Sequence, residues 1–232
     1  MVGFVLSKKQ VWNKIVKTIF FILLSFLIGI LLGKIHEMLE VETMTYVEKK
    51  RVALTFDDGP NPLYTQTLLN GLRERGVKAT FFLLGKEAEQ YPGLVKEIHG
   101  DGHLIGIHSY EHVDFGACGS GEACEQVSKT DEILYKLTGQ HPDYIRPPYG
   151  RWCDALEEQF QLIEVLWDVD PLDWNCKDAG TVERRILNKV EDGDIILMHD
   201  ASATSVQAAL DVIDSLTKEG YEFVTVDALI AD

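Results

Sequence analysis

Short, largely apolar runs alternate with longer mixed segments from residue 51 to the end of the chain, which predicts strands alternating with helices. Turn residues bound each run, as expected for strands of a buried parallel sheet. Seven runs fit this description: Val52–Phe56, Ala79–Leu84, Leu104–Ile107, Tyr144–Arg146, Leu162–Leu166, Asp194–Met198 and Glu222–Val226. Seven alternations without an internal repeat predict an α/β fold, a distorted (β/α)7-type parallel barrel that is closed or nearly so.

The helical period is clearest between Ser205 and Thr217. One face of this segment carries its apolar side chains, which are Val206, Ala209, Leu210, Ile213 and Leu216. Gly76 and Gly220 are predicted to end their helices, because glycine readily adopts the left-handed conformation found there. In barrels of this type the functional side chains gather at the C-terminal ends of the strands. The residues that follow each strand are therefore the candidates for chemistry.

A longer apolar run occupies the N-terminus. No charged residue occurs from Ile19 to Gly33, and the apolar character reaches back to Val11 with three polar interruptions, the last at Lys17. A membrane-spanning helix needs about 20 residues, and the run reaches that length if Lys17 extends toward the membrane interface. The apolar core of a signal peptide is the alternative. No small-x-small cleavage site and no lipidation cysteine follow the run, so we predict an uncleaved transmembrane helix.

Charged residues on the two sides of this run predict its orientation. The lysines before it are Lys8, Lys9, Lys14 and Lys17, and the glutamates after Lys34 are Glu37, Glu40 and Glu42. Positive residues favour the cytoplasmic side of a membrane. We therefore predict a cytoplasmic tail and membrane anchor in residues 1–34, a polar stalk in 35–50 and an external globular domain in 51–232.

The globular part of the chain is strongly acidic. The 232 residues carry a formal net charge of −15, and the first 34 contribute five lysines and no acids, so residues 35–232 carry −20. Such a surface argues against nucleic acid and against anionic lipid headgroups as partners. The hydrophobic content of 46% fits a globular class.

Two adjacent carboxylates, Asp57 and Asp58, follow the first predicted strand and precede Gly59-Pro60. Such a pair can divide its work, with one carboxylate bound to a metal and the other free to accept a proton. The competing interpretation is a turn, because Asp-Asp-Gly-Pro is also ordinary turn sequence.

Two histidines, His108 and His112, follow the third predicted strand. Imidazoles four residues apart on one turn can bind one ion, and a carboxylate from another strand end would complete a three-ligand site with an open position for water. The spacing also occurs by chance in surface histidines.

Three more polar clusters follow later strands: Arg146-Pro147-Pro148-Tyr149-Gly150, Asp170-Pro171-Leu172-Asp173-Trp174 and Leu197-Met198-His199. Each has a structural interpretation as a turn, a core aromatic residue or a strand end. All five clusters nevertheless fall at the same end of their strands, which favours an enzyme site that contains a metal.

The five clusters resemble the five motifs of the polysaccharide deacetylases, carbohydrate esterase family 4 with its NodB homology domain. The first two clusters are Thr55-Phe56-Asp57-Asp58-Gly59-Pro60 and His108-Ser109-Tyr110-Glu111-His112. The resemblance covers about residues 48–230. It implies that residues 51–232 form a catalytic domain, a distorted barrel that hydrolyses N-acetyl or O-acetyl groups from a polysaccharide.

The resemblance also implies a role for each motif residue. Asp58, His108 and His112 would hold a divalent metal, zinc or cobalt, and Asp57 would be the general base, paired with Arg146. The backbone N–H of Tyr149 would face the oxyanion. His199, tuned by Asp173, would be the general acid that protonates the leaving amine. The pocket for the acetyl group would be formed by Trp174, Leu197 and Pro148.

Location and resemblance together indicate a membrane-anchored deacetylase with its catalytic domain outside the cell. Peptidoglycan N-acetylglucosamine is then the leading substrate, followed by chitin-like or exported polysaccharide. A catalytically inactive glycan-binding module is the alternative from another functional class. It would be expected to have lost a ligand, the base or the acid, and all of these residues are present.

Four cysteines lie outside the motifs. In an external domain an even number first indicates disulfides, and we predict the pairs Cys153–Cys176 and Cys118–Cys124. Four unpaired thiols are the alternative. Other conspicuous side chains are interpreted as structural: Phe81, Phe82 and Trp167 as core, Trp152 as packing or sugar stacking, and His36, His99, His103 and His141 as surface or loop residues.

Overall fold

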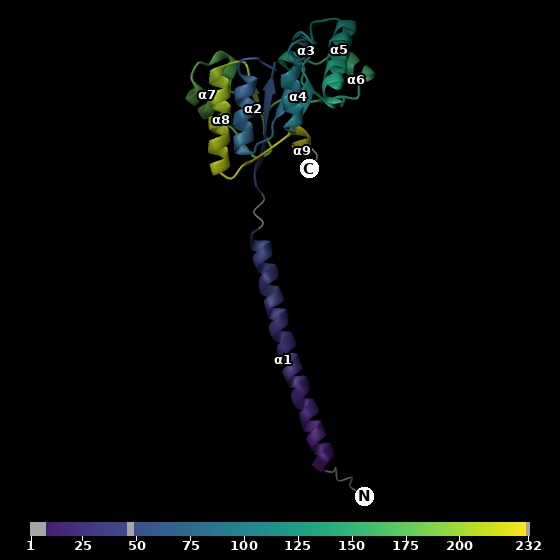
Figure 1. The fold of residues 1–232 in the computed structure, drawn as a ribbon, viewed down its shortest axis with the longest axis vertical. Coiled ribbons are helices and arrows are strands. Elements are labelled where there is room, and N and C mark those ends of the chain that lie inside the picture. The colour runs from purple at the N-terminus through teal and green to yellow at the C-terminus, as the bar shows by residue number, and fades with distance from the viewer. Residues whose placement is uncertain (1–7, 46–48, 231–232) are drawn as a thin grey trace. The chain divides into compact units, whose positions relative to one another are not determined.

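A computed structural model describes residues 8–45 and 49–230 (Figure 1). The chain divides into two compact units, Met1–Glu48 and Lys49–Asp232. The described part of the first unit is one helix, α1 (Lys8–Thr45). Its segment Val11–Met38 is long and apolar enough to cross a membrane, a test that a signal sequence also passes. Because no glycine or proline follows Gly33 before Thr45, the helix continues through most of the predicted stalk.

The second unit alternates strands and helices, as predicted. Within residues 49–230 the strands are β1 (Arg51–Asp57), β2 (Thr80–Leu83), β3 (Leu104–Ile107), β4 (Tyr144–Ile145), β5 (Ile163–Glu164), β6 (Ile195–His199) and β7 (Glu222–Val224). The helices are α2 (Thr65–Arg75), α3 (Gly85–Gln90), α4 (Pro92–Gly100), α5 (Ser120–Thr138), α6 (Asp154–Gln159), α7 (Ala179–Leu187), α8 (Ala203–Lys218) and α9 (Val226–Ile230), with 3-10 turns η1 (Pro148–Gly150) and η2 (Asp173–Asn175).

All strand pairs of the sheet are parallel, in the order β5-β4-β3-β2-β1-β6, and β7 pairs with the beginning of β1. The edge strands β5 and β6 are connected by the residues that follow β5. Strand β5 pairs with β4, and Val169, a few residues after β5, makes a parallel bridge to Ile196 of β6. The sheet therefore curls into a nearly closed barrel, which confirms the predicted fold class.

Helices cover the outside of the curled sheet, and α8, α2 and α4 lie next to one another in Figure 1. The predicted apolar face of α8 is confirmed, with Val206, Ala209, Ile213 and Leu216 buried and Leu210 half-buried. Helix α2 ends in Gly76, whose φ of 64° is left-handed as predicted. Phe81 and Phe82 are fully buried in the core, also as predicted.

The register of the strands brings the predicted motifs together. Asp57, the last residue of β1, is the direct partner of His199, the last residue of β6. Ile107 at the end of β3 pairs with Ile145 of β4, so His108 and Arg146 follow on adjacent strands. The carboxyl ends of β1, β3, β4 and β6 thus supply side chains to one region.

The four cysteines are free thiols in the structure, so the predicted disulfide pairing is not found. Cys153 and Cys176 have different surroundings: the Cys153 sulfur lies 4.0 Å from the Ser120 hydroxyl at the start of α5, whereas the Cys176 sulfur lies 3.5 Å from the Asp178 carbonyl. Cys124 is buried on α5, where its sulfur lies 3.9 Å from the carbonyl of Ala155.

Candidate active site

The first strand ends in two carboxylates with different surroundings. Asp57 is 3% exposed, and its Oδ1 accepts a hydrogen bond from Arg146 Nη1 at 2.7 Å. Asp58 has a left-handed φ of 70° and is more exposed than its neighbour, with 35% of its side chain accessible. Its Oδ1 is a buried oxygen without a hydrogen-bond partner within the described residues. The adjacent carboxylates are therefore chemically distinct.

Arg146 is fully buried at the centre of the site. Besides Asp57, its guanidinium donates to the Thr55 hydroxyl at 2.7 Å and to the carbonyls of Val165 and Leu166 at 3.1 and 2.9 Å. Burial lowers the pKa of this guanidinium, and the charge and hydrogen bond of Asp57 raise it. Because a guanidinium remains protonated in proteins, Arg146 forms an ion pair with Asp57 Oδ1 at 2.7 Å and leaves Asp57 Oδ2 on the pocket side, 3.8 Å from His108 Nε2.

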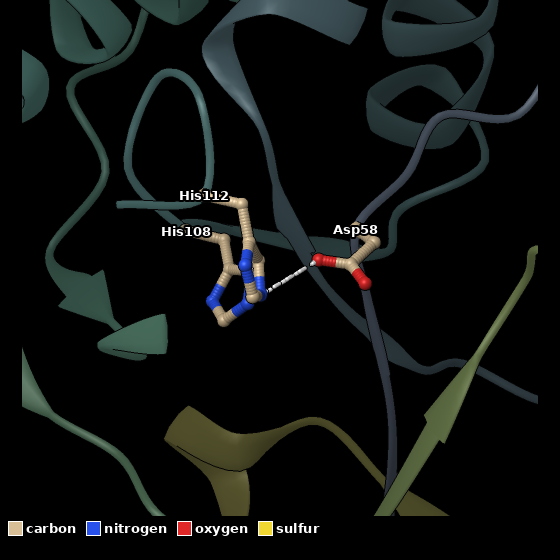
Figure 2. A group of neighbouring side chains, drawn as sticks. All are labelled: Asp58, His108 and His112. Carbon is tan, nitrogen blue, oxygen red and sulfur yellow. Dashed lines mark ion pairs between the residues drawn. The ribbon is translucent and has the colours of Figure 1, made fainter. Parts of the chain in front are cut away.

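Asp58, His108 and His112 form a group whose ligand atoms all lie within 4.8 Å of one another. Figure 2 shows the two imidazoles side by side and turned toward the Asp58 carboxylate. Asp58 Oδ1 lies 3.5 Å from His108 Nε2 and 3.4 Å from His112 Nε2. Ligand atoms at about 2.0–2.2 Å from a tetrahedral zinc ion would lie about 3.3–3.6 Å apart. The spacing of the three side chains, and the unpartnered Asp58 oxygen, therefore fit a metal.

The tautomer of His108 is fixed by its backbone partner. Its Nδ1 lies 2.7 Å from the carbonyl oxygen of Arg146. A carbonyl only accepts hydrogen bonds, so Nδ1 carries the proton and Nε2 presents a lone pair toward Asp58. Burial lowers the pKa of His108, although the charges of Asp57 and Asp58 oppose this effect. A neutral imidazole held by a second-sphere carbonyl is the usual form of a histidine metal ligand.

His199 stands on the other side of the pocket, held by Asp173. Its Nδ1 donates to Asp173 Oδ1 at 2.8 Å, and its backbone N–H donates to Asp173 Oδ2 at 2.9 Å. Burial opposes protonation of the ring, but the hydrogen bond and charge of Asp173, together with the charges of Asp57 and Asp58, raise the pKa of His199 to about 9. The ring is therefore an imidazolium near neutral pH, with Nε2 directed into the site 4.0 Å from Asp58 Oδ2.

These side chains border a pocket of about 500 Å³. The predicted residues in its lining are Asp57, Asp58, His108, His112, Tyr149, Trp174, Leu197 and His199. Arg146 and Asp173 are buried behind this lining. Pro147 borders the pocket, whereas the predicted Pro148, the first residue of the η1 turn, is not part of its lining.

Two tryptophans, Trp152 and Trp167, occupy different environments in the structure. Trp167 is predicted to lie in the core but lines the pocket, half-buried, in the segment between β5 and the bridge of Val169 to Ile196 of β6. Trp152 packs against the core, as one of its two interpretations proposed. Asp170 also lines the pocket, and no sequence signal separated it from its neighbours.

Strained backbone marks the site. The non-glycine residues with positive φ among those described are Asp58, Ser109, His112, Tyr149 and Leu172. All lie within the five motif segments. A left-handed conformation is costly for residues other than glycine, so surrounding contacts must hold these turns in place.

Asp200 is a buried residue that sequence reasoning missed. Its carboxylate accepts a hydrogen bond from the Thr65 hydroxyl and lies against the turn that follows Asp58. Burial, against the opposing effect of Thr65, raises the pKa of Asp200 to about 6. A Cβ on Gly59 would lie 2.8 Å from Asp200 Oδ2, so only glycine fits after the two aspartates.

The buried ion pair predicts a large effect on stability. Arg146→Met would leave the Asp57 carboxylate buried without its cation, and we expect the free energy of unfolding to fall by about 3–5 kcal/mol. Denaturant titration with linear extrapolation measures the change. Arg151→Met is the matched control, because Arg151 pairs with Asp114 at the surface, where such pairs contribute about 1 kcal/mol or less. Equal losses in the two variants would contradict the importance of the buried pair.

Comparison with known proteins identifies relatives. The sequence model of the family described as polysaccharide deacetylase matches residues 45–164. The chain is 39% identical over 196 residues to the peptidoglycan-N-acetylmuramic acid deacetylase PdaC of Bacillus subtilis, covering 84% of this chain and 42% of that protein. It is 39% identical over 190 residues to a peptidoglycan-N-acetylglucosamine deacetylase of Bacillus cereus, covering 78% of this chain and 68% of that protein. The chain thus spans about two fifths of the length of the first of these relatives.

Solved structures share the fold. The structure of PdaC from Bacillus subtilis superposes with a TM-score of 0.77 at 40% identity, covering 79% of this chain and 91% of that chain. A structure described as a pseudoenzyme of carbohydrate esterase family 4, from Bacillus anthracis, gives a TM-score of 0.74 at 29% identity, covering 79% and 66%. The family match, the relatives and the shared fold show that this chain belongs to the polysaccharide deacetylase family.

Proposed function

We propose that this protein is a metal-dependent hydrolase that removes acetyl groups from a cell-wall polysaccharide, with peptidoglycan N-acetylglucosamine as its leading substrate. One observation carries the proposal. A metal-binding trio, an Arg146-bound carboxylate and an Asp173-bound imidazolium face one another across a single pocket. The names of the relatives from Bacillus support peptidoglycan as the polymer.

Polysaccharide deacetylases of this family depend on a metal, and zinc is our proposal for the ion here, with cobalt as a substitute. The donors are two imidazoles and one carboxylate oxygen, a set that zinc accepts in catalytic sites while one coordination position stays open. Asp58, His108 and His112 would hold the ion. When bound, it polarises the acetyl carbonyl and lowers the pKa of a water molecule to about 7.

Asp57 is proposed as the general base. Its Oδ1 is occupied by Arg146, and its Oδ2, 3.8 Å from His108 Nε2, lies beside the metal-binding group. The contact with Arg146 fixes the orientation of this carboxylate. A water molecule next to the trio would therefore meet a proton acceptor held in one orientation.

His199 is proposed as the general acid, because an amine leaves the tetrahedral intermediate only after its nitrogen is protonated. Its Nδ1–H is held by Asp173, so Nε2 carries the proton to be given. The backbone N–H of Tyr149 is the proposed donor to the oxyanion. Tyr149 itself has a left-handed φ of 61°. Trp174 and Leu197, both in the pocket lining, would contact the acetyl methyl group.

Acetate release from purified glycans tests the function. Wild-type protein is expected to release acetate from peptidoglycan faster than from chitooligosaccharides or acetylxylan, to lose activity with a chelator and to regain it with added zinc. Asp57→Asn is expected to lower kcat by about 100- to 10,000-fold, the usual contribution of a general base, while still binding zinc. His112→Ala is expected to lose zinc binding as well.

Three results would contradict this proposal. Full activity of Asp57→Asn would remove its role as base. Activity that persists after complete metal removal would exclude the metal site. Glycan binding without acetate release under any metal would indicate an inactive binding module, as in a pseudoenzyme.

The pH dependence of kcat tests the role of His199. The reaction requires the protonated His199 ring. We therefore expect kcat to be retained while the pH is below the His199 pKa of about 9 and to be lost as the pH rises through that value. Asp173→Asn removes the partner that raises this pKa, while burial still lowers it, so the alkaline limb is expected to move to lower pH. Asp170→Asn is the control, because Asp170 lines the same pocket but its Oδ1 accepts a hydrogen bond from the Leu172 backbone N–H, whereas His199 Nδ1 donates to Asp173. An unchanged limb in Asp173→Asn would contradict the assignment.

We also propose that α1 anchors the chain in the membrane, with residues 1–34 as cytoplasmic tail and anchor and the catalytic domain outside the cell. The apolar segment Val11–Met38 and the four lysines between residues 8 and 17 support this topology. The protein is expected in the membrane fraction, with the domain digested by protease added to intact spheroplasts. A shortened, soluble protein in the medium would indicate a cleaved signal sequence instead.

A further inference from the structure

The turn that carries His108 and His112 has little means of holding its own shape. Ser109 and His112 have positive φ values of 66° and 62°. Within the turn, the Ser109 hydroxyl accepts the backbone N–H of His112 at 2.8 Å. The N–H groups of Tyr110 and Glu111 point away from this contact and must find acceptors elsewhere.

One side chain supplies both acceptors. Gln126, half-buried on α5, accepts hydrogen bonds through its Oε1 from the N–H of Tyr110 at 2.9 Å and from the N–H of Glu111 at 2.8 Å. These donors lie in the middle of the turn, between the two histidines. A single amide oxygen thus fixes the backbone that separates His108 from His112.

Helix α3 holds the opposite side of the same turn. The N–H of Gly85 donates to the Ser109 carbonyl at 3.0 Å, and the N–H of Lys86 donates to the Tyr110 carbonyl at 3.1 Å. A Cβ on Gly85 would lie 2.4 Å from the Thr130 hydroxyl of α5, so the two helices approach closely here. Helix α3 therefore holds two carbonyls of the turn, and Gln126 of α5 holds the two central N–H groups of the turn.

We propose that Gln126 is a positioning residue for the metal site. Its amide oxygen, by holding the N–H groups of Tyr110 and Glu111, fixes the separation and direction of the His108 and His112 imidazoles. The inference rests on the proposed function, in which these imidazoles bind the metal. Loss of the acceptor would leave two N–H groups without a partner and release a turn that two left-handed residues already strain.

Three variants separate positioning from a general effect on the fold. Gln126→Met keeps the length of the side chain and removes the acceptor. Gln126→Glu keeps an acceptor oxygen that can serve both N–H groups. Gln66→Met makes the same change at another half-buried glutamine, which donates from α2 to Glu97 and does not contact the turn.

Metal binding by the full chain is the readout. Zinc affinity is measured by competition with a chromophoric chelator, and the visible spectrum of bound cobalt reports the coordination geometry. Gln126→Met is expected to bind zinc about tenfold more weakly than the wild type. This is the lower end of the loss in metal affinity, about 10- to 100-fold, that follows removal of a group that supports a metal ligand. Its cobalt spectrum is expected to change. Gln126→Glu and Gln66→Met are expected to match the wild type in both measurements.

The other possible results would contradict either the inference about Gln126 or the proposed function. Unchanged zinc affinity and cobalt spectrum in Gln126→Met would overturn the inference and leave the proposed function intact. Equal weakening in Gln126→Met and Gln66→Met, or no rescue by Gln126→Glu, would also overturn it, since the effect would not depend on the acceptor. No metal binding by the wild type would overturn the proposed function and the inference with it.

Discussion

The buried ion pair between Arg146 and Asp57 is the interaction on which the rest of the site depends. A guanidinium without solvent exposure is tolerated only when its donors find acceptors. Here the end of β1, the segment after β5 and the Asp57 carboxylate accept four hydrogen bonds from it. The pair joins two sides of the barrel. It also assigns different chemistry to neighbouring carboxylates, because only Asp57 faces the guanidinium. Asp58 is left with a buried oxygen that accepts no hydrogen bond within residues 8–45 and 49–230 and that lies beside two imidazoles.

The strand register and the strained turns convert this pair into a site. Parallel pairing sets Asp57 next to His199, so base and acid candidates occupy adjacent strand ends. The ligand turns depart from the strands through left-handed residues that would be unstable alone. Contacts from elsewhere hold them: Asp200 lies against the Asp58 turn, and Gln126 binds the histidine turn. Residues outside the five motifs therefore help to hold the proposed metal-binding side chains in place.

The sequence predicted the strands and the chemistry at their ends for physical reasons. Strands such as Val52–Phe56 are apolar runs, and the carboxyl ends of parallel strands must meet, so five polar clusters were expected to converge. Supporting residues were not predictable in the same way. Gln126 is an ordinary polar residue of a surface helix until the fold brings it to a turn 15 residues away. Trp167 has the local pattern of a core residue, and the cysteine pairing failed because spacing along the chain does not report which segments face each other.

The central claim is that Arg146 divides the work of two adjacent carboxylates, one for the metal and one for the proton. A crystal structure of the zinc-loaded protein, with zinc located by anomalous scattering, tests this most directly. The account predicts one zinc ion bonded to Asp58, His108 and His112 at about 2.0–2.2 Å, with Asp57 still bonded to Arg146 and off the metal. Zinc bonded to Asp57, with the Arg146 contact broken, would contradict it.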